Sequence, residues 1–277
     1  MAQRLIIEAG RTERQYWRDL WRYRELFYFL SWRDFLIRYR QTAVGVLWSL
    51  LKPVVMMLVL TMVGNFSNLP TAGAPGPLFF FAAMLPWQFF STALSESGNS
   101  LVNNANLVSK TYFPRLVVPA SSVIVCFADF LISAAFLAVL MAYYHFNPHY
   151  HFVPPAAIFL LPLFVVLVVA LSLGAGLWIA ALMVEYRDFR FIVPFVIQFG
   201  FIASVMLMPS KLPEKWRLLY SLNPVVGVID GFRWCLLGLD NAIYLPGLLA
   251  SVVWSVVLIV SGLWYFRRME RTFADTI

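Results

Sequence analysis

Residues 155–184 read PAAIFLLPLFVVLVVALSLGAGLWIAALMV, without a single Asp, Glu, Lys or Arg. The hydrocarbon core of a bilayer requires about 20 apolar residues per spanning helix, so this stretch is long enough to cross a membrane. The same lack of charge recurs in three further stretches, which are residues 53–95, 191–210 and 241–266. The chain is therefore predicted to be an all-α integral membrane protein.

The composition agrees with this class. Hydrophobic residues make up 61% of the chain and charged residues 13%, whereas a soluble domain carries about 25% charged residues. A net charge of +7 would suggest nucleic acid in a soluble protein, but in a membrane protein basic residues gather in cytoplasmic loops beside anionic lipid. We therefore expect membrane lipid and no nucleic acid as a partner. The two cysteines, Cys126 in an apolar run and Cys235 in a loop, do not indicate a redox compartment.

Turn residues divide the apolar stretches into six predicted spans, which cover residues 43–64, 78–95, 116–144, 155–184, 191–208 and 245–266. An even number of spans places both termini on one side of the membrane. Most of the Lys and Arg outside the spans fall on that side, and because such residues mark cytoplasmic loops, both termini are predicted to be cytoplasmic. The predicted parts are a cytoplasmic N-terminal segment (1–42), a six-span membrane domain (43–267) and a cytoplasmic tail (268–277).

Residues 16–39 alternate aromatic and basic side chains at helical spacing. This pattern predicts a basic amphipathic helix that lies in the cytoplasmic interface. Such a helix is either a plain membrane anchor or an anchor that also docks a cytoplasmic partner, and the pattern leaves both interpretations open. The candidate residues on its surface are Trp17, Trp21, Arg22 and Glu25.

The segment 209–244 is too apolar for a solvated loop and too interrupted for a span. Asn223-Pro224 and the glycines Gly227, Gly231 and Gly238 break it. Irregular backbone at membrane depth must be buried in protein or line a cavity. Two short re-entrant helices that dip into the outer leaflet are therefore predicted between the fifth and sixth spans, and segments of this kind often gate a path.

Several kinds of chemistry are missing from the sequence. No Gly-x-x-x-x-Gly-Lys-Ser/Thr phosphate loop and no His-Glu-x-x-His or paired-cysteine metal motif is present, so the chain is not expected to hydrolyse ATP alone or to hold a metal. Asp129 is the one acid deep within a span. An intramembrane acid is a functional candidate, and the alternative is a bond to a neighbouring helix or subunit.

Five strings carry a family resemblance. They are RYRQTAVGVLWSLLKP (38–53), NLVSKTYFPR (106–115), EYRDFR (185–190), LNP (222–224) and ERTFAD (270–275). In this order they resemble the permease subunits of type-2 ABC exporters for polysaccharides. The likeness is closest to O-antigen, or lipopolysaccharide, exporter permeases, with capsule and teichoic acid exporters as near relatives.

The resemblance implies a transporter subunit and not an enzyme. Two copies of the chain would form a transmembrane pathway, and two copies of a separate ABC ATPase would bind ATP and Mg²⁺ below it, with no cofactor on this chain. The substrate would be a polysaccharide on a polyprenyl pyrophosphate lipid. It would move from the cytoplasmic to the outer face of the bacterial inner membrane.

The resemblance also implies roles for particular residues. The segment 103–113 would be a coupling helix, and its ATPase contacts would be Asn103, Asn106, Lys110, Tyr112, Phe113 and Arg115. Stacking aromatics would line the glycan path, unless they face lipid: Trp48, Phe66, Phe81, Trp87, Phe90, Phe195 and Phe199. Cations at the inner mouth would attract the pyrophosphate headgroup, unless they are only positive-inside anchors: Arg38, Arg40 and Lys52.

Other functional classes compete with this interpretation. A membrane enzyme of glycan assembly needs polar catalytic groups in a large outer loop, whereas the predicted outer loops carry only Glu214, Asp230 and Asp240 as acids. An ion-coupled flippase would show more spans and more intramembrane ionisable residues. The nearest alternative is an ABC exporter of another substrate, such as capsule, teichoic acid, a lipid or a drug.

Overall fold

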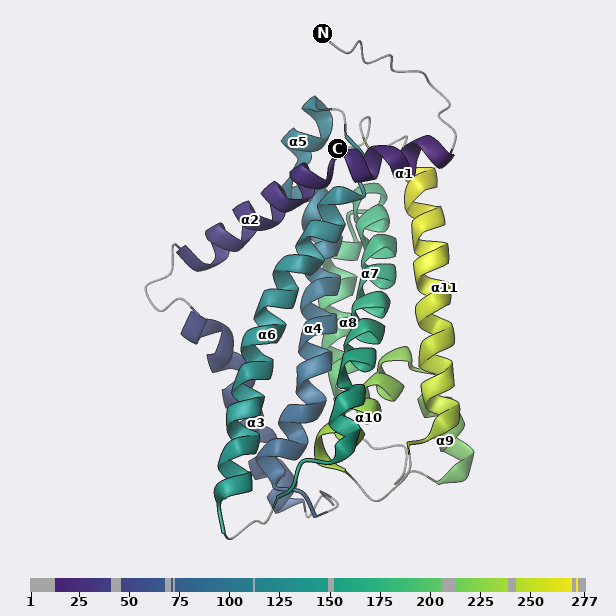
Figure 1. Cartoon of the computed structure of the whole chain (residues 1–277). Helices are drawn as coiled ribbons and strands as arrows, with labels where there is room; N and C mark the ends of the chain where they lie inside the picture. Colours follow the sequence, from purple (N-terminus) through teal and green to yellow (C-terminus); the bar gives the residue numbers. More distant parts are fainter. Residues whose placement is uncertain are drawn as a thin grey trace.

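The architecture comes from a computed structural model, which describes residues 13–40, 46–67, 71, 73–111, 113–148, 152–205, 213–238, 243–270 and 273, without the side chains of residues 13–15, 46–48 and 214. These described residues form helices and connections and contain no strand (Figure 1). The helices are α1 (Glu13–Arg22), α2 (Arg24–Arg40), α3 (Val46–Phe66), α4 (Gly76–Asn103), α5 (Ala105–Lys110), α6 (Val117–Phe146), η1 (Ala156–Leu160), α7 (Leu161–Glu185), α8 (Phe189–Val205), α9 (Glu214–Ser221), α10 (Pro224–Leu237) and α11 (Leu245–Met269).

Five segments of the described chain are long and apolar enough to cross a membrane. They are Ser49–Phe66, Gly76–Asn103, Val117–Phe146, Ala156–Glu185 and Leu245–Met269. The chain is thus an all-helical membrane protein. The fifth predicted span, residues 191–208, corresponds to α8, an apolar helix of 17 residues that is shorter than the other spans.

Helix α4 is the centre of the bundle. In its apolar window 78% of the residues are buried, against 22% in the windows of α3 and α11. It packs against α6 and α7, and α7 packs in turn against α11. The second predicted span ended at Ser95, but the helix continues to Asn103, so Glu96 lies within a helix and not in a polar connection.

The helices α7 and α11 cross at small residues. An added Cβ on Gly174 would lie 2.6 Å from the Ile259 backbone nitrogen, and one on Gly262 would lie 2.6 Å from the Gly174 carbonyl oxygen. Close backbone approach of this kind holds membrane helices together, because lipid leaves little hydrophobic drive for association.

The N-terminal segment lies across one end of the bundle, called here the α5 end because α5 lies there too (Figure 1). The single helix predicted over residues 16–39 is two helices, α1 and α2, with a turn at Tyr23 between them. The α1 helix is held by Arg267 of α11, whose guanidinium lies 4.7 Å from the centre of the Tyr16 ring. The α2 helix packs mainly against α6.

A buried cluster of apolar side chains lies beside α2. It contains Leu30 of α2, Phe113, and Phe266 and Phe273 near the chain's C-terminal end. The Arg115 backbone N–H donates to Glu270 Oε1 at 2.7 Å, and burial raises the pKa of the Glu270 carboxyl. The end of α11 is thereby fixed to the start of α6.

The opposite end, called the α10 end, carries the two short helices α9 and α10 (Figure 1). Asn223 caps α10 by accepting from the Val225 N–H at 3.2 Å, and Gly238 ends it in the left-handed conformation with φ of 59°. Nearly all of α10 is buried, including Cys235, which the sequence had suggested to be in a loop. The helix packs against α4, α7 and α11.

Candidate functional site

Arg38, near the end of α2, is the centre of a polar cluster at the α5 end. Its Nη1 lies 2.6 Å from Asp129 Oδ2 of α6, and its Nη2 lies 2.7 Å from Glu96 Oε1 of α4. One guanidinium therefore joins three helices. The side chains of Arg38 and Asp129 are only 28% and 26% exposed, so each charge depends on its partner.

Asp129 has a second partner in α2, because the Tyr39 hydroxyl donates to its other carboxylate oxygen, Oδ1. This acid was open to two interpretations, a functional acid or a bond to a neighbouring helix. Both of its oxygens are used to hold α2 against α6, which is the second interpretation.

Next to this cluster is a cavity of about 320 Å³ between α2, α3, α4 and α6. Its polar lining includes Arg38, Tyr39 and Asp129 of the cluster and Lys52 of α3, together with Ser49, Gln88, Thr92 and Ser133. Its remaining wall is apolar and aromatic, from Pro53, Leu85, Phe89 and Phe130. The cavity can therefore receive a group that is polar on one side and apolar on the other.

The three predicted headgroup cations differ in their environment. Arg38 is engaged by two carboxylates. Arg40 and Lys52 are exposed, and no ion pair of Lys52 occurs among the described residues. Arg40 is not in the lining of the cavity, so the charge available there to an incoming anion is that of Lys52, whereas Arg38 first has to exchange its partners.

The predicted coupling segment is divided by its burial. Asn103, Asn106 and Lys110 are exposed around α5. Phe113 is buried in the cluster with Leu30, and the Arg115 guanidinium donates to the Glu270 carbonyl oxygen. These two side chains hold the segment in place. Tyr112 lies outside the described residues.

The four residues proposed for the interface helix all reach the surface. Trp17 and Trp21 are 46% and 72% exposed, and Arg22 and Glu25 are also exposed. The Arg24 guanidinium lies 5.7 Å from the centre of the Trp21 ring. The α1 helix lies at the same end of the bundle as α5 (Figure 1).

The aromatic residues proposed for a glycan path fall into two groups. Phe66 on α3 and the pair Phe195 and Phe199 on α8 are exposed, and the rings of that pair lie 4.4 Å apart. Phe81 and Trp87 are instead buried in the core, where they pack the bundle. Phe90 is half-buried against Trp87, and the side chain of Trp48 lies outside the described residues.

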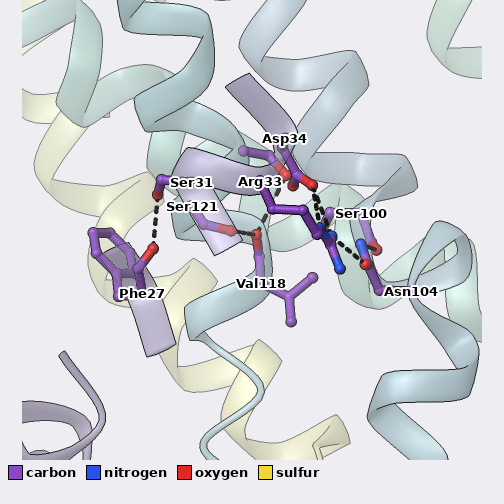
Figure 2. Close-up of polar contacts among 9 residues, drawn as sticks. Phe27, Ser31, Arg33, Asp34, Ser100, Asn104, Val118 and Ser121 are labelled. Atoms are coloured by element: carbon purple, nitrogen blue, oxygen red, sulfur yellow. Dashed lines mark hydrogen bonds and ion pairs between the residues drawn. The ribbon is translucent and has the colours of Figure 1, made fainter. Parts of the chain in front are cut away.

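Sequence reasoning missed a further contact at the α5 end. Arg33 of α2 donates from Nη2 to Asn104 Oδ1 at 2.8 Å, as Figure 2 shows. Asn104 is the single residue between α4 and α5. The available signal was the spacing of Glu96, Ser100 and Asn104, which lie four residues apart and share one helix face.

Arg233 of α10, at the opposite end, is a second unpredicted feature. It is only 1% exposed, its guanidinium lies 4.4 Å from the centre of the Phe79 ring, and Nη2 donates to the Val205 carbonyl at 2.7 Å. Its Nε and Nη1 atoms have no hydrogen-bond partner among the residues that the structure describes. Burying a cation whose N–H groups lack acceptors costs free energy. The position of the Arg233 guanidinium therefore carries such a cost at its Nε and Nη1 atoms.

Comparison with known proteins assigns the family. Residues 25–237 match the model of the ABC-2 type transporter family. The chain is 30% identical over 271 residues to the O-antigen export system permease protein RfbA of Myxococcus xanthus, covering 94% of this chain and 98% of that one. Two proteins of the same name from Klebsiella pneumoniae are 25% and 24% identical over 256 residues, each covering 91% of this chain and 95% of the relative. The chain therefore belongs to the ABC-2 type transporter family, as a membrane-spanning transporter subunit and not an enzyme.

Proposed function

We propose that this chain is the transmembrane subunit of an ATP-driven exporter that moves a lipid-linked polysaccharide of O-antigen type across the bacterial inner membrane. The observation that carries the proposal is similarity over 94% of the chain to a permease named for O-antigen export, together with 98% coverage of that relative. Export would run from the cytoplasmic to the outer face, through a homodimer of this chain.

The proposed topology has six spans with both termini in the cytoplasm. The α8 helix supplies the fifth span, and its 17 residues give about 26 Å of helix. A helix slightly shorter than the hydrocarbon core is accommodated by local thinning of the bilayer. The arginines of α1 and α2 and Lys110 of α5 gather at one end, which supports a cytoplasmic position for that end.

Two exposed surfaces at the α5 end fit an ATPase partner. The short helix α5 can enter a cleft of the ATPase, and its surroundings offer polar groups from Asn103, Asn106 and Lys110. Tyr112 follows two residues after Lys110 in the chain. The exposed aromatic and charged residues of α1 and the start of α2 offer a second surface. ATP and Mg²⁺ would bind to the partner, and we propose two ATPase copies for each homodimer.

The headgroup of a polyprenyl pyrophosphate lipid suits the cavity beside Arg38. Lys52 in the lining is an available cation for a diphosphate, with Arg40 exposed two residues after Arg38, and the apolar wall suits the lipid chain. The exposed aromatic residues Phe66, Phe195 and Phe199 suit a glycan, because stacking on a ring tolerates many different sugars. The helices α9 and α10 would form a re-entrant gate at the outer face.

The test is removal of the gene from its native host, followed by restoration with the intact chain. The proposal predicts that polysaccharide linked to the polyprenyl lipid accumulates on the cytoplasmic face and disappears from the cell surface until the chain is restored. Normal surface O-antigen, with loss of a capsule or another envelope polymer instead, would assign a different substrate. A block in glycan synthesis itself would contradict export.

A further inference from the structure

The α2 helix meets α4 through long side chains. It packs along α6, and a polar cavity of about 380 Å³ lies where α2, α4 and α6 come together. The cavity is lined on the α2 side by Arg33, Asp34, Ile37 and Arg38, and on the α4 side by Glu96, Ser100, Asn103 and Asn104. The attachment of α2 to α4 therefore depends on a few polar groups.

Two arginines of α2 bridge this cavity. Arg38 Nη2 reaches Glu96 Oε1 at 2.7 Å, and Arg33 Nη2 reaches Asn104 Oδ1 at 2.8 Å. Glu96 of α4 and Asn104, directly after α4, lie on one side of the end of this helix, because they are eight residues apart and residues four apart share a helix face. The two bridges therefore fix both the position and the direction of α2 relative to α4.

Arg33 is braced for its contact. Its Nε donates to Asp34 Oδ1 at 2.8 Å, and its Nη2 lies 2.7 Å from the same oxygen. Figure 2 shows the Arg33 side chain extended from α2 toward Asn104, with Asp34 alongside. A planar guanidinium held in this way has a defined direction, which a lysine would lack.

Asn104 is the joint between two helices. It has φ of −108° and ψ of 27°, outside regular helix, so that α4 ends on one side of it and α5 begins on the other. Its side-chain nitrogen donates to the Ser100 carbonyl at 2.9 Å, while its side-chain oxygen accepts from Arg33. A movement of α5 about this joint therefore acts on α2 through the charged Asn104–Arg33 hydrogen bond, beside the apolar cluster that contains Leu30 of α2 and Val108 of α5.

We propose that Arg33 and Asn104 are positioning residues that transmit displacement of α5 to α2, and hence to the wall of the cavity beside Arg38. The inference rests on the proposed function in one respect, that α5 is the helix moved by the ATPase. It adds the path of the movement: α5 to Asn104, Asn104 to Arg33, and α2 to the mouth where the lipid headgroup would bind.

The test compares Asn104→Ala with Asn99→Ala in the complex of this chain with its co-purified ATPase. Asn99 is a matched control, since its side-chain nitrogen donates to the Ser95 carbonyl at 2.9 Å, as Asn104 does to Ser100. Only Asn104 also binds Arg33. The readouts are complex assembly, ATP hydrolysis by the purified complex, and surface polysaccharide in cells that carry the variant as their single copy.

Asn104→Ala is expected to assemble and to hydrolyse ATP like the wild type, while export for each ATP consumed falls about tenfold, the scale of one hydrogen bond to a charged group. Asn99→Ala is expected to export normally. Asn104→Asp restores export, because a carboxylate also accepts from Arg33. Equal export by Asn104→Ala and Asn99→Ala would overturn the proposal.

If Asn104→Ala does not assemble with the ATPase, the proposal is tested by comparing Arg33→Met with Arg33→Lys. These variants leave the residue between α4 and α5 unaltered. Lysine can still donate to Asn104 and is expected to retain more export than methionine. Equal export by the two variants, or failure of both Asn104→Ala and Arg33→Met to assemble, would show a merely structural contact. A wild-type chain that has neither an ATPase partner nor export counts against the proposed function instead.

Discussion

At the scale of single residues, Arg233 is a buried cation that donates to the Val205 carbonyl oxygen and lies over the Phe79 ring. We expect Arg233→Met to lower the thermal stability of the purified protein less than Arg233→Ala does, because methionine fills the space beside Phe79 and removes a desolvated charge, while the nearby Asp230 loses the attraction of Arg233 in both variants. Arg233→Ala should lower the stability by about 2–5 kcal/mol through the cavity left beside Phe79.

The measurement is thermal unfolding in one detergent, with Arg187→Met as the control, since Arg187 is exposed in the turn before α8. Its melting temperature should equal that of the wild type. A loss of stability in Arg233→Met as large as that in Arg233→Ala would contradict this prediction. It would mean that the guanidinium itself stabilises α10 and that its Nε and Nη1 atoms have hydrogen-bond partners in the membrane.

The Arg38–Asp129 pair is expected to show strong energetic coupling. Arg38→Met and Asp129→Ala should each cost about 1–3 kcal/mol, less than for a fully buried pair because both side chains are partly exposed. The loss of stability in the double variant should be smaller than the sum of the two single losses by at least about 0.5 kcal/mol. A double-mutant cycle in thermal unfolding measures this difference, and strictly additive losses would contradict the pairing.

Residue roles were the least predictable part of the molecule. The sequence identified Asp129 as the one acid deep within a span, and the family resemblance pointed to Arg38 and Lys52 as cations at the inner mouth. They did not show that Arg38 binds Asp129 and Glu96 across 91 and 58 positions of sequence. Nor did they separate the buried Phe81 from the exposed Phe66, because aromatics face core and lipid equally well in a membrane protein.

At the scale of elements, the α7–α11 crossing brings two long helices close together, and it depends on glycine. We expect Gly174→Ala to destabilise the protein by about 1–3 kcal/mol or more, since its Cβ would lie 2.6 Å and 2.7 Å from backbone atoms of Ile259 and Leu258. Backbone atoms in a packed helix cannot move aside as a side chain can.

Gly76→Ala is the control for this prediction, because the nearest atom to its Cβ would be a methyl group of Thr61 at 3.1 Å. Thermal unfolding and the yield of membrane-inserted protein check the pair of variants. If Gly174→Ala were as stable as Gly76→Ala, the two helices would not approach as closely as the fold requires.

The existence of the long helices could be predicted from sequence, because an uncharged stretch of sufficient length has few alternatives in lipid. Their ends were harder to predict. The α4 helix continues past Ser95 through Glu96 to Asn103, since a charged residue that binds a neighbouring helix does not end a span. The break at Tyr23 between α1 and α2 has no glycine or proline to mark it.

At the scale of the whole molecule, the family could be predicted because five strings in the right order span most of the chain, and the match over residues 25–237 confirms it. The arrangement also has a direction. Exposed polar and aromatic groups of α1 and α5 lie at the α5 end, whereas the helix toward the opposite end, α10, is buried (Figure 1). This polarity suits a transporter driven from one side.

The most direct test of the central claim is purification of the tagged chain from its native membrane in mild detergent, with the mass and stoichiometry of everything that accompanies it. We predict an equimolar second polypeptide that contains a phosphate-binding loop, and a complex that hydrolyses ATP. A homo-oligomer with no ATPase, obtained under conditions that preserve known membrane complexes, would contradict the proposed function.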